Sequence, residues 1–77
     1  MASLVYFTKL SEKDSSVRYA FGEDPTEMVR SLTIDKGTRR SSPDDENTDY
    51  LFLKASRKIN WVYGESGSWP ERGMGAS

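Results

Sequence analysis

The pattern of hydrophobic and polar residues in the first part of the chain predicts two β-strands. Residues Leu4 to Leu10 are rich in strand formers, and Tyr6 and Phe7 fall on opposite faces of any strand they form. The polar residues 11–16 follow as a turn. From Val17 to Phe21 every second residue is apolar, which is typical of a strand with one buried face. We expect these two strands to pair as an antiparallel hairpin.

A third strand follows after an interruption at residues 22–27. Within that segment, Asp24-Pro25 suits the cap and first residue of a single helical turn. Alternation returns from Val29 onward, with Leu32 and Ile34 on the inner face and polar residues between them.

Residues 35–41 predict a hairpin and a possible fourth strand. Asp35-Lys36-Gly37 resembles a type I turn followed by a left-handed glycine, a common hairpin closure. Residues Thr38 to Ser41 would then add a short fourth strand.

A helical pattern replaces the alternation in the last third of the chain. Ser42-Pro43-Asp44-Asp45-Glu46 combines a serine cap, a proline at the first helical position and acidic residues in the first turn, all of which favour a helix start. Asn47 and Thr48 are competing caps. We expect a helix from about Thr48 to Tyr63, ended by Gly64 and Gly67.

One face of this helix is apolar over an arc of roughly 120°. Its residues are Leu51, Phe52, Ala55, Ile59, Val62 and Tyr63. The stripe must pack on the sheet, because the pattern offers no other apolar surface. The sequence therefore predicts an α+β domain over residues 1–68, in which a three-stranded or four-stranded antiparallel sheet packs against one C-terminal amphipathic helix. Trp69-Pro70 would tuck back onto it, at the start of a flexible tail over residues 69–77.

Composition narrows the chemistry available to such a domain. The 77 residues suffice for one hydrophobic core. Without cysteine there is no disulfide or thiolate metal site, which fits a reducing cytoplasm, and without histidine the commonest general base is missing. The apolar run at the N-terminus breaks at Lys9, too early for a signal peptide or a membrane span. We expect a cytoplasmic protein that does not associate with membranes.

No residue cluster predicts catalysis or cofactor binding. The glycines lack the spacing of a P-loop or a dinucleotide fingerprint. The carboxylates of Asp44, Asp45, Glu46 and Asp49 could in principle hold a hard cation, but acidic residues at the positive end of a helix dipole explain them without an ion. We therefore expect no catalytic residue, no metal and no cofactor, and a protein that is not an enzyme.

A second stripe beside the apolar one is the candidate binding surface. Tyr50, Lys54, Arg57 and Trp61 lie on one helix face, with Lys58 between this stripe and the core. Aromatic faces beside cations suit an anionic partner. The alternative is that the aromatic residues wrap the edge of the core while the cations form a solvated face.

Two classes of function fit these residues. The first is a noncatalytic interaction module that binds a protein partner or a second copy, through an exposed sheet edge or through the Tyr50 and Trp61 side of the helix. The second is a weak nucleic-acid-binding domain that uses the same face, with Arg18 and Arg30 as sheet contributors. The net charge of −1 favours the first, because the whole molecule does not attract nucleic acid. Lys36, Arg39 and Arg40 form another basic cluster at a hairpin end.

Three segments of the chain carry a resemblance to known proteins. They are Leu32-Thr33-Ile34-Asp35-Lys36, Asp49-Tyr50-Leu51-Phe52-Leu53-Lys54-Ala55 and Trp69-Pro70-Glu71-Arg72-Gly73. In these segments the chain is similar to a family of small actinobacterial proteins of unknown function. The resemblance implies a bacterial cytoplasmic setting and implies no activity.

Overall fold

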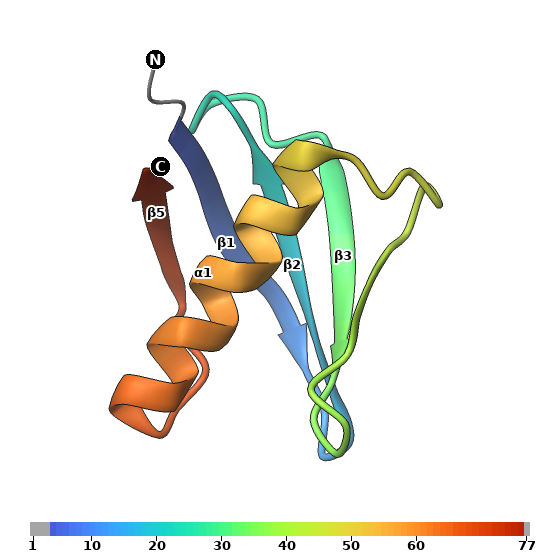
Figure 1. Cartoon of the computed structure of the whole chain (residues 1–77), viewed down its shortest axis with the longest axis vertical. Coiled ribbons are helices and arrows are strands. Elements are labelled where there is room, and N and C mark those ends of the chain that lie inside the picture. Colours follow the sequence, from blue (N-terminus) through green and yellow to red (C-terminus); the bar gives the residue numbers. More distant parts are fainter. Residues whose placement is uncertain (1–3, 77) are drawn as a thin grey trace.

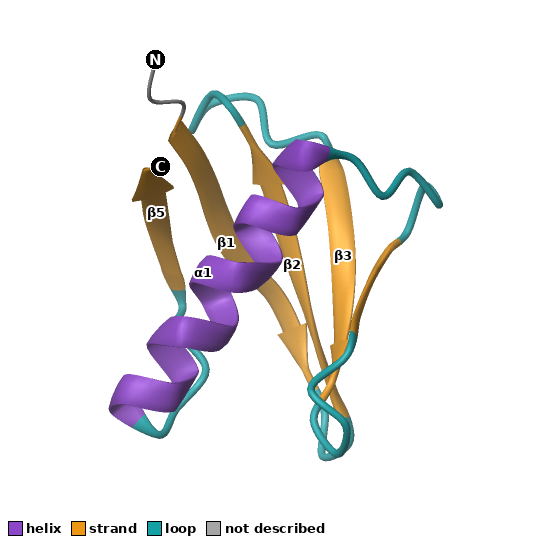
Figure 2. Ribbon diagram, viewed as in Figure 1, coloured by secondary structure: helices purple, strands orange, loops and turns teal. Residues whose placement is uncertain are grey.

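The computed structural model describes residues 4–76, which form a five-stranded antiparallel sheet and one helix packed on one face of it (Figure 1). Along the chain the elements are β1 (Leu4–Glu12), β2 (Ser16–Gly22), β3 (Arg30–Asp35), β4 (Ser41–Pro43), α1 (Tyr50–Ser66) and β5 (Arg72–Ala76). The strand order in the sheet is β4-β3-β2-β1-β5. The α+β class is confirmed, and the sheet has five strands where three or four were expected. Figure 2 shows the two layers, sheet behind and helix in front.

The strand register places the large apolar residues on the face that α1 covers. Phe7 lies opposite Phe21 across β1 and β2, and Tyr19 lies opposite Leu32 across β2 and β3. The ring of Phe7 meets that of Tyr19 edge-on, with 5.7 Å between centroids. From the helix, the buried apolar side chains are those expected at the centre of the apolar stripe, Phe52, Ala55 and Ile59. The alternation in the sequence thus identified the inner faces of β2 and β3, and the structure adds Val5 and Phe7 as the inner residues of β1.

The helix begins at Tyr50, close to the start expected at about Thr48. Its N-cap is Asp49, whose carboxylate accepts a hydrogen bond from the backbone N–H of Phe52 at 3.0 Å. The earlier start that Ser42-Pro43 favours does not form, because these residues belong to β4 and pair with β3. A turn follows, in which the N–H of Glu46 donates to the carbonyl of Pro43 and Glu46 has a positive φ of 61°. Pairing with β3 therefore overrides a strong local helix signal.

The β3–β4 hairpin closes differently from the predicted turn. The carboxylate of Asp35 accepts hydrogen bonds from the N–H groups of Gly37 and Thr38, as the polar turn chemistry suggests. The left-handed residue, however, is Arg39 with φ 65°, and Gly37 has no positive φ. The loop is consequently longer than expected, and the fourth strand is Ser41–Pro43 instead of Thr38 to Ser41.

The C-terminal end of the helix also differs from prediction. Gly64 lies within α1, and the helix ends at Gly67, which has φ 78° and donates its N–H to the carbonyl of Tyr63 at 2.8 Å. Trp69 then folds back as expected and stacks on Tyr63 with 4.1 Å between ring centroids. The hydroxyl of Tyr19 donates to the carbonyl of Pro70 at 2.6 Å, which anchors this segment on the sheet.

Residues 72–76 form the strand β5 and pair with β1, so the expected flexible tail at residues 69–77 is corrected over this range. Two glycines allow this pairing beneath the helix layer. A Cβ at Gly73 would lie 2.7 Å from the end of the Phe7 ring, and a Cβ at Gly75 would lie 3.1 Å from Cγ of Lys58. Within residues 4–76, no helix is long and apolar enough to span a membrane.

We predict that Gly73→Ala destabilises the protein by about 1–3 kcal/mol, the usual range for forcing an extra methyl into a packed core. The new Cβ would press on the buried Phe7 ring, so either the ring or β5 must move. Urea unfolding measures the change in the free energy of unfolding.

Gly64→Ala is the matched control, because it adds the same methyl group within α1, where no atom lies near the new Cβ. It should stabilise the protein by about 0.5–1 kcal/mol through higher helix propensity. Equal stability of Gly73→Ala and the wild type would contradict the packing described for β5.

Candidate functional site

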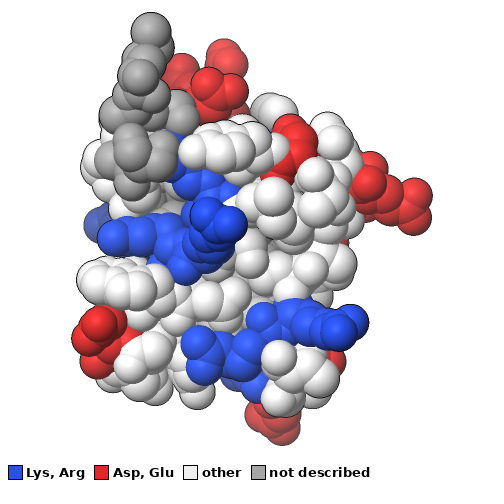
Figure 3. Space-filling model, in the orientation of Figure 1, with Lys and Arg blue, Asp and Glu red and all other residues white. Residues whose placement is uncertain are grey.

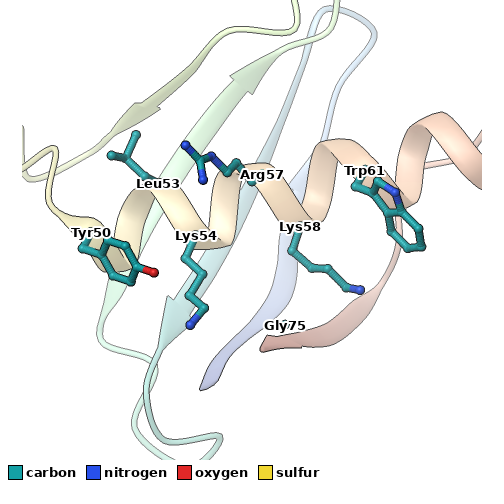
Figure 4. A pocket seen from close by; sticks show the side chains of 7 residues that line it. All are labelled: Tyr50, Leu53, Lys54, Arg57, Lys58, Trp61 and Gly75. Carbon is teal, nitrogen blue, oxygen red and sulfur yellow. The ribbon is translucent and has the colours of Figure 1, made fainter. Parts of the chain in front are cut away.

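A groove lies between α1 and β5 on the helix face of the molecule. It has a volume of about 370 Å³. Its lining residues are Tyr50, Leu53, Lys54, Arg57, Lys58, Trp61 and Gly75 (Figure 4). All five candidate residues from the sequence, Tyr50, Lys54, Arg57, Lys58 and Trp61, therefore line one groove.

Two further lining residues were missed by sequence reasoning. Leu53 follows Tyr50 by one helical turn, so the helical period alone could have found it. Gly75 could not have been found, because its contribution depends on the pairing of β5 with β1.

Large apolar side chains are exposed along this groove. Tyr50 retains 63%, Trp61 57% and Leu53 42% of its accessible surface. These fractions argue against the alternative that Tyr50 and Trp61 wrap the edge of the core, because such residues would be mostly covered. In the core stripe, by contrast, Phe52, Ala55 and Ile59 are buried, and Leu51 and Tyr63 pack partly buried against them.

Cations stand between these apolar groups. The stem of Lys58 lies on the backbone of Gly75, and its Nζ is 4.5 Å from the centre of the Trp61 ring. Lys54 is only 9% exposed, with its Nζ 5.6 Å from the centre of the Tyr50 ring. In Figure 4 both lysines point from α1 toward the β5 side, while Leu53 and Arg57 point to the opposite rim.

The groove is basic because the described part of the chain offers its two most exposed cations no carboxylate. Neither Arg57 nor Lys58 makes an ion pair within residues 4–76. Tyr50 through Gly64 carry three basic and no acidic side chains. Figure 3 shows the Lys and Arg side chains gathered over this face, with acidic side chains at its margins.

The other basic residues considered from the sequence do not join this groove. Arg18 lies on the opposite face of the sheet from α1 and pairs with Asp44 at 2.9 Å. Lys36 pairs with Glu12 at 2.7 Å. Arg39 reaches the other flank of α1, where its Nε donates to Oδ1 of Asn60 and its guanidinium lies 4.6 Å from the centre of the Tyr63 ring.

Arg30 holds the loop that leads into the helix. Its guanidinium donates to Asp49 at 2.8 Å, to Asp45 at 2.8 Å and to the carbonyl of Asn47 at 2.8 Å. It also lies 4.8 Å from the centre of the Phe21 ring. These contacts fix the first residue of α1, Tyr50, and with it one end of the groove.

The acidic cluster is organised by arginine, and the helix-dipole explanation holds only for Asp49, the N-cap. Asp44 lies before the helix and accepts hydrogen bonds from Arg18, Ser31 and Thr33. Among residues 4–76, no three acidic side chains are grouped so that they could hold a metal ion.

Hydrogen bonds lower the pKa values of both carboxylates that Arg30 contacts. For Asp45 the main cause is the hydrogen bond from Arg30, followed by the N–H of Asn47. For Asp49 the main cause of the lowered pKa is the N–H of Phe52, followed by Arg30. Both groups therefore bind protons less readily in the folded chain than in the unfolded one.

No protein-family model, curated protein or solved structure with which we compared the chain matches it. The similarity to small actinobacterial proteins stays a prediction.

We predict that Arg30→Ala destabilises the protein by about 1–2 kcal/mol at neutral pH, because it removes several charged hydrogen bonds and the cover over Phe21. The pH dependence should change as well. Carboxylates with lowered pKa values stabilise the folded state above their unfolded pKa, near pH 4, and this contribution is lost as the pH falls through the folded pKa values. The free energy of unfolding of the wild type should therefore fall on acidification. In Arg30→Ala it should fall less steeply, mainly because the pKa of Asp45 is no longer lowered by Arg30.

Arg57→Ala is the control for this experiment, because Arg57 has no carboxylate partner within residues 4–76. Thermal unfolding between neutral pH and pH values near 2 compares the three proteins. Identical pH profiles for Arg30→Ala and Arg57→Ala would show that Arg30 does not control these carboxylates.

Proposed function

We propose that this chain is a noncatalytic binding module whose groove between α1 and β5 receives an acidic segment of a partner protein. The observation that carries the proposal is the combination, in one groove, of three exposed large apolar side chains with cations that have little counter-charge nearby. Tyr50, Leu53 and Trp61 supply the apolar surface, and Arg57 and Lys58 supply the exposed charge.

The apolar groups support a protein partner. Contiguous exposed apolar surface on a small soluble domain is typical of an interaction site, and tyrosine, tryptophan and arginine are the residues that contribute most energy at such sites. Trp61 stands beside Lys58, so a ligand carboxylate near the ammonium group would bring its own apolar atoms onto the indole ring.

The charges support an acidic partner over a nucleic acid. Few cations line the groove, and the two arginines considered as sheet contributors, Arg18 and Arg30, are paired with carboxylates. A handful of phosphate contacts supports only weak, salt-sensitive binding. A peptide carboxylate needs fewer cations, and peptide side chains can cover the apolar groups.

Catalysis is not part of the proposal, since the chain contains neither histidine nor cysteine and the groove lining contains no carboxylate. The role proposed for the groove is recognition through shape and charge.

We predict that the wild-type protein selects acidic peptides with interspersed apolar residues from a random peptide library displayed on phage. The double variant Arg57→Glu, Lys58→Glu should bind a selected peptide at least about tenfold more weakly, because it replaces attraction by repulsion. Trp61→Ala should weaken binding by about tenfold through the loss of an aromatic anchor. Fluorescence anisotropy of the labelled peptide measures these affinities.

The matched control is Lys13→Glu, Arg40→Glu, which changes the net charge equally at exposed positions outside the groove. It should retain most of the affinity. An equal loss of affinity in both double variants would show that only the net charge matters, and would contradict specific binding in the groove. Binding of a single-stranded oligonucleotide at low salt, lost in Arg57→Glu, Lys58→Glu, would favour the nucleic-acid function instead.

A further inference from the structure

The sheet has two edges among the described residues, and they differ in how well they are closed. At one edge, β4 has only three residues and ends at Pro43, after which the N–H of Asp44 donates to the carbonyl of Ser31. Short strands and proline are common protections against further pairing. At the other edge, β5 has five residues and contains no proline and a single charged side chain, that of Arg72. The edge at β5 is therefore the more open to another strand.

The register determines which backbone groups of β5 point outward. The N–H of Lys9 donates to the carbonyl of Glu71 at 2.7 Å, and Phe7 and Val5 lie opposite Gly73 and Gly75. In an antiparallel pair every second residue exchanges hydrogen bonds with its partner, so Gly73 and Gly75 face β1. The N–H and C=O groups of Met74, between them, consequently point away from the sheet.

Hollows flank β5 on both faces of the sheet. On the helix face lies the groove with Lys58, Trp61 and Gly75. On the other face lies a hollow of about 340 Å³, whose lining includes Tyr6, Thr8, Pro25, Met28, Arg72 and Met74. Successive side chains of a strand point to opposite faces. A strand added to β5 would thus direct alternate side chains toward a basic, aromatic groove and toward a mostly apolar hollow.

A second copy of this chain is a poor candidate for that strand. Antiparallel pairing of two β5 strands requires a two-fold axis perpendicular to the sheet, which keeps both helices on the same face. The two basic grooves, each with Arg57 and Lys58, would then face one another across the new pair of strands. Like charges that meet at an interface oppose association, whereas an acidic strand would neutralise them.

We infer that the acidic partner binds as an extended strand added to the free edge of β5. Its backbone pairs with Met74, its acidic side chains enter the groove beside Lys58, with Arg57 on the far rim, and its alternate apolar side chains enter the hollow beside Met74. This inference rests on the proposed function, and it specifies an extended backbone and an alternating sequence where the proposed function requires only an acidic segment.

The probe is a synthetic peptide of alternating glutamate and valine, compared with a peptide of the same composition in which the glutamates and valines form two blocks. Only the alternating peptide places acidic and apolar groups on opposite faces of a strand. It should bind more tightly and should slow hydrogen exchange at the Met74 amide by about tenfold, as a new backbone hydrogen bond would.

Met74→Pro tests the same contact by substitution. Proline is tolerated at an outward-pointing position of an edge strand, because the missing N–H makes no bond within the sheet. It should weaken binding of the alternating peptide by about tenfold, which is the loss expected for one backbone hydrogen bond at an interface. Met74→Ala shortens the side chain but keeps the N–H, and it should lose clearly less affinity. Melting temperatures check that both variants fold, and the exchange measurement on the wild type does not depend on either.

The outcomes separate this inference from the proposed function. Peptide binding that needs Arg57 and Lys58 but leaves Met74 exchange and the Met74→Pro affinity unchanged would overturn strand addition and leave the acidic partner standing. Failure of every acidic peptide to bind would overturn both. A third outcome is a dimer that sedimentation detects without peptide and in which the Met74 amide is protected from exchange. This outcome would show that a second copy, and not an acidic partner, pairs with β5.

Discussion

The rest of the structure depends on one geometric constraint, which is that a single helix must cover a five-stranded sheet. Strands spaced about 4.8 Å apart make a sheet about 19 Å wide between its outer strands, whereas a helix with its side chains is about 10–12 Å across. The helix therefore crosses the sheet diagonally, as Figure 1 shows, and packs mainly on β1, β2 and β5. Two corners of the sheet remain beside it. Polar contacts bridge the corner near β4, where Ser41 bonds Ser56 and Arg39 bonds Asn60. The groove occupies the other corner.

The charged residues are also distributed unequally between these two corners of the sheet. The loop between β4 and α1 contains most of the acidic residues near the helix, and the partners of Asp44, Asp45 and Asp49 are Arg18 and Arg30. These pairs connect the helix start to β2 and β3. The cations of α1 lie on the far side and are left with few acidic neighbours. A net charge of −1 thus conceals a local separation, with paired charges on one flank and a basic groove on the other.

The sequence was informative wherever structure depends on neighbours along the chain. Strand-forming residues identified β1, alternation identified β2 and β3 with their inner faces, and the helical period placed all five candidate residues on one side of α1. The errors arose where distant segments pair. Ser42-Pro43 has the local chemistry of a helix start, but its pairing with β3 decides its conformation. Residues 72–76 have the composition of a tail, and only the register with β1 explains why glycine stands at positions 73 and 75.

Those glycines connect the packing of the sheet to the existence of the groove. On its helix face β5 presents Gly73 over the Phe7 ring and Gly75 under the stem of Lys58, so the strand has no side chain there that could reach α1. A larger side chain at either position would fill the corner between β5 and α1. The same side chain would collide with Phe7 or Lys58. The packing that allows β5 to join the sheet therefore leaves the space beside it open. The stem of Lys58 lies against Gly75 and its ammonium group reaches the Trp61 ring, which brings a cation and an aromatic ring together beside the sheet edge.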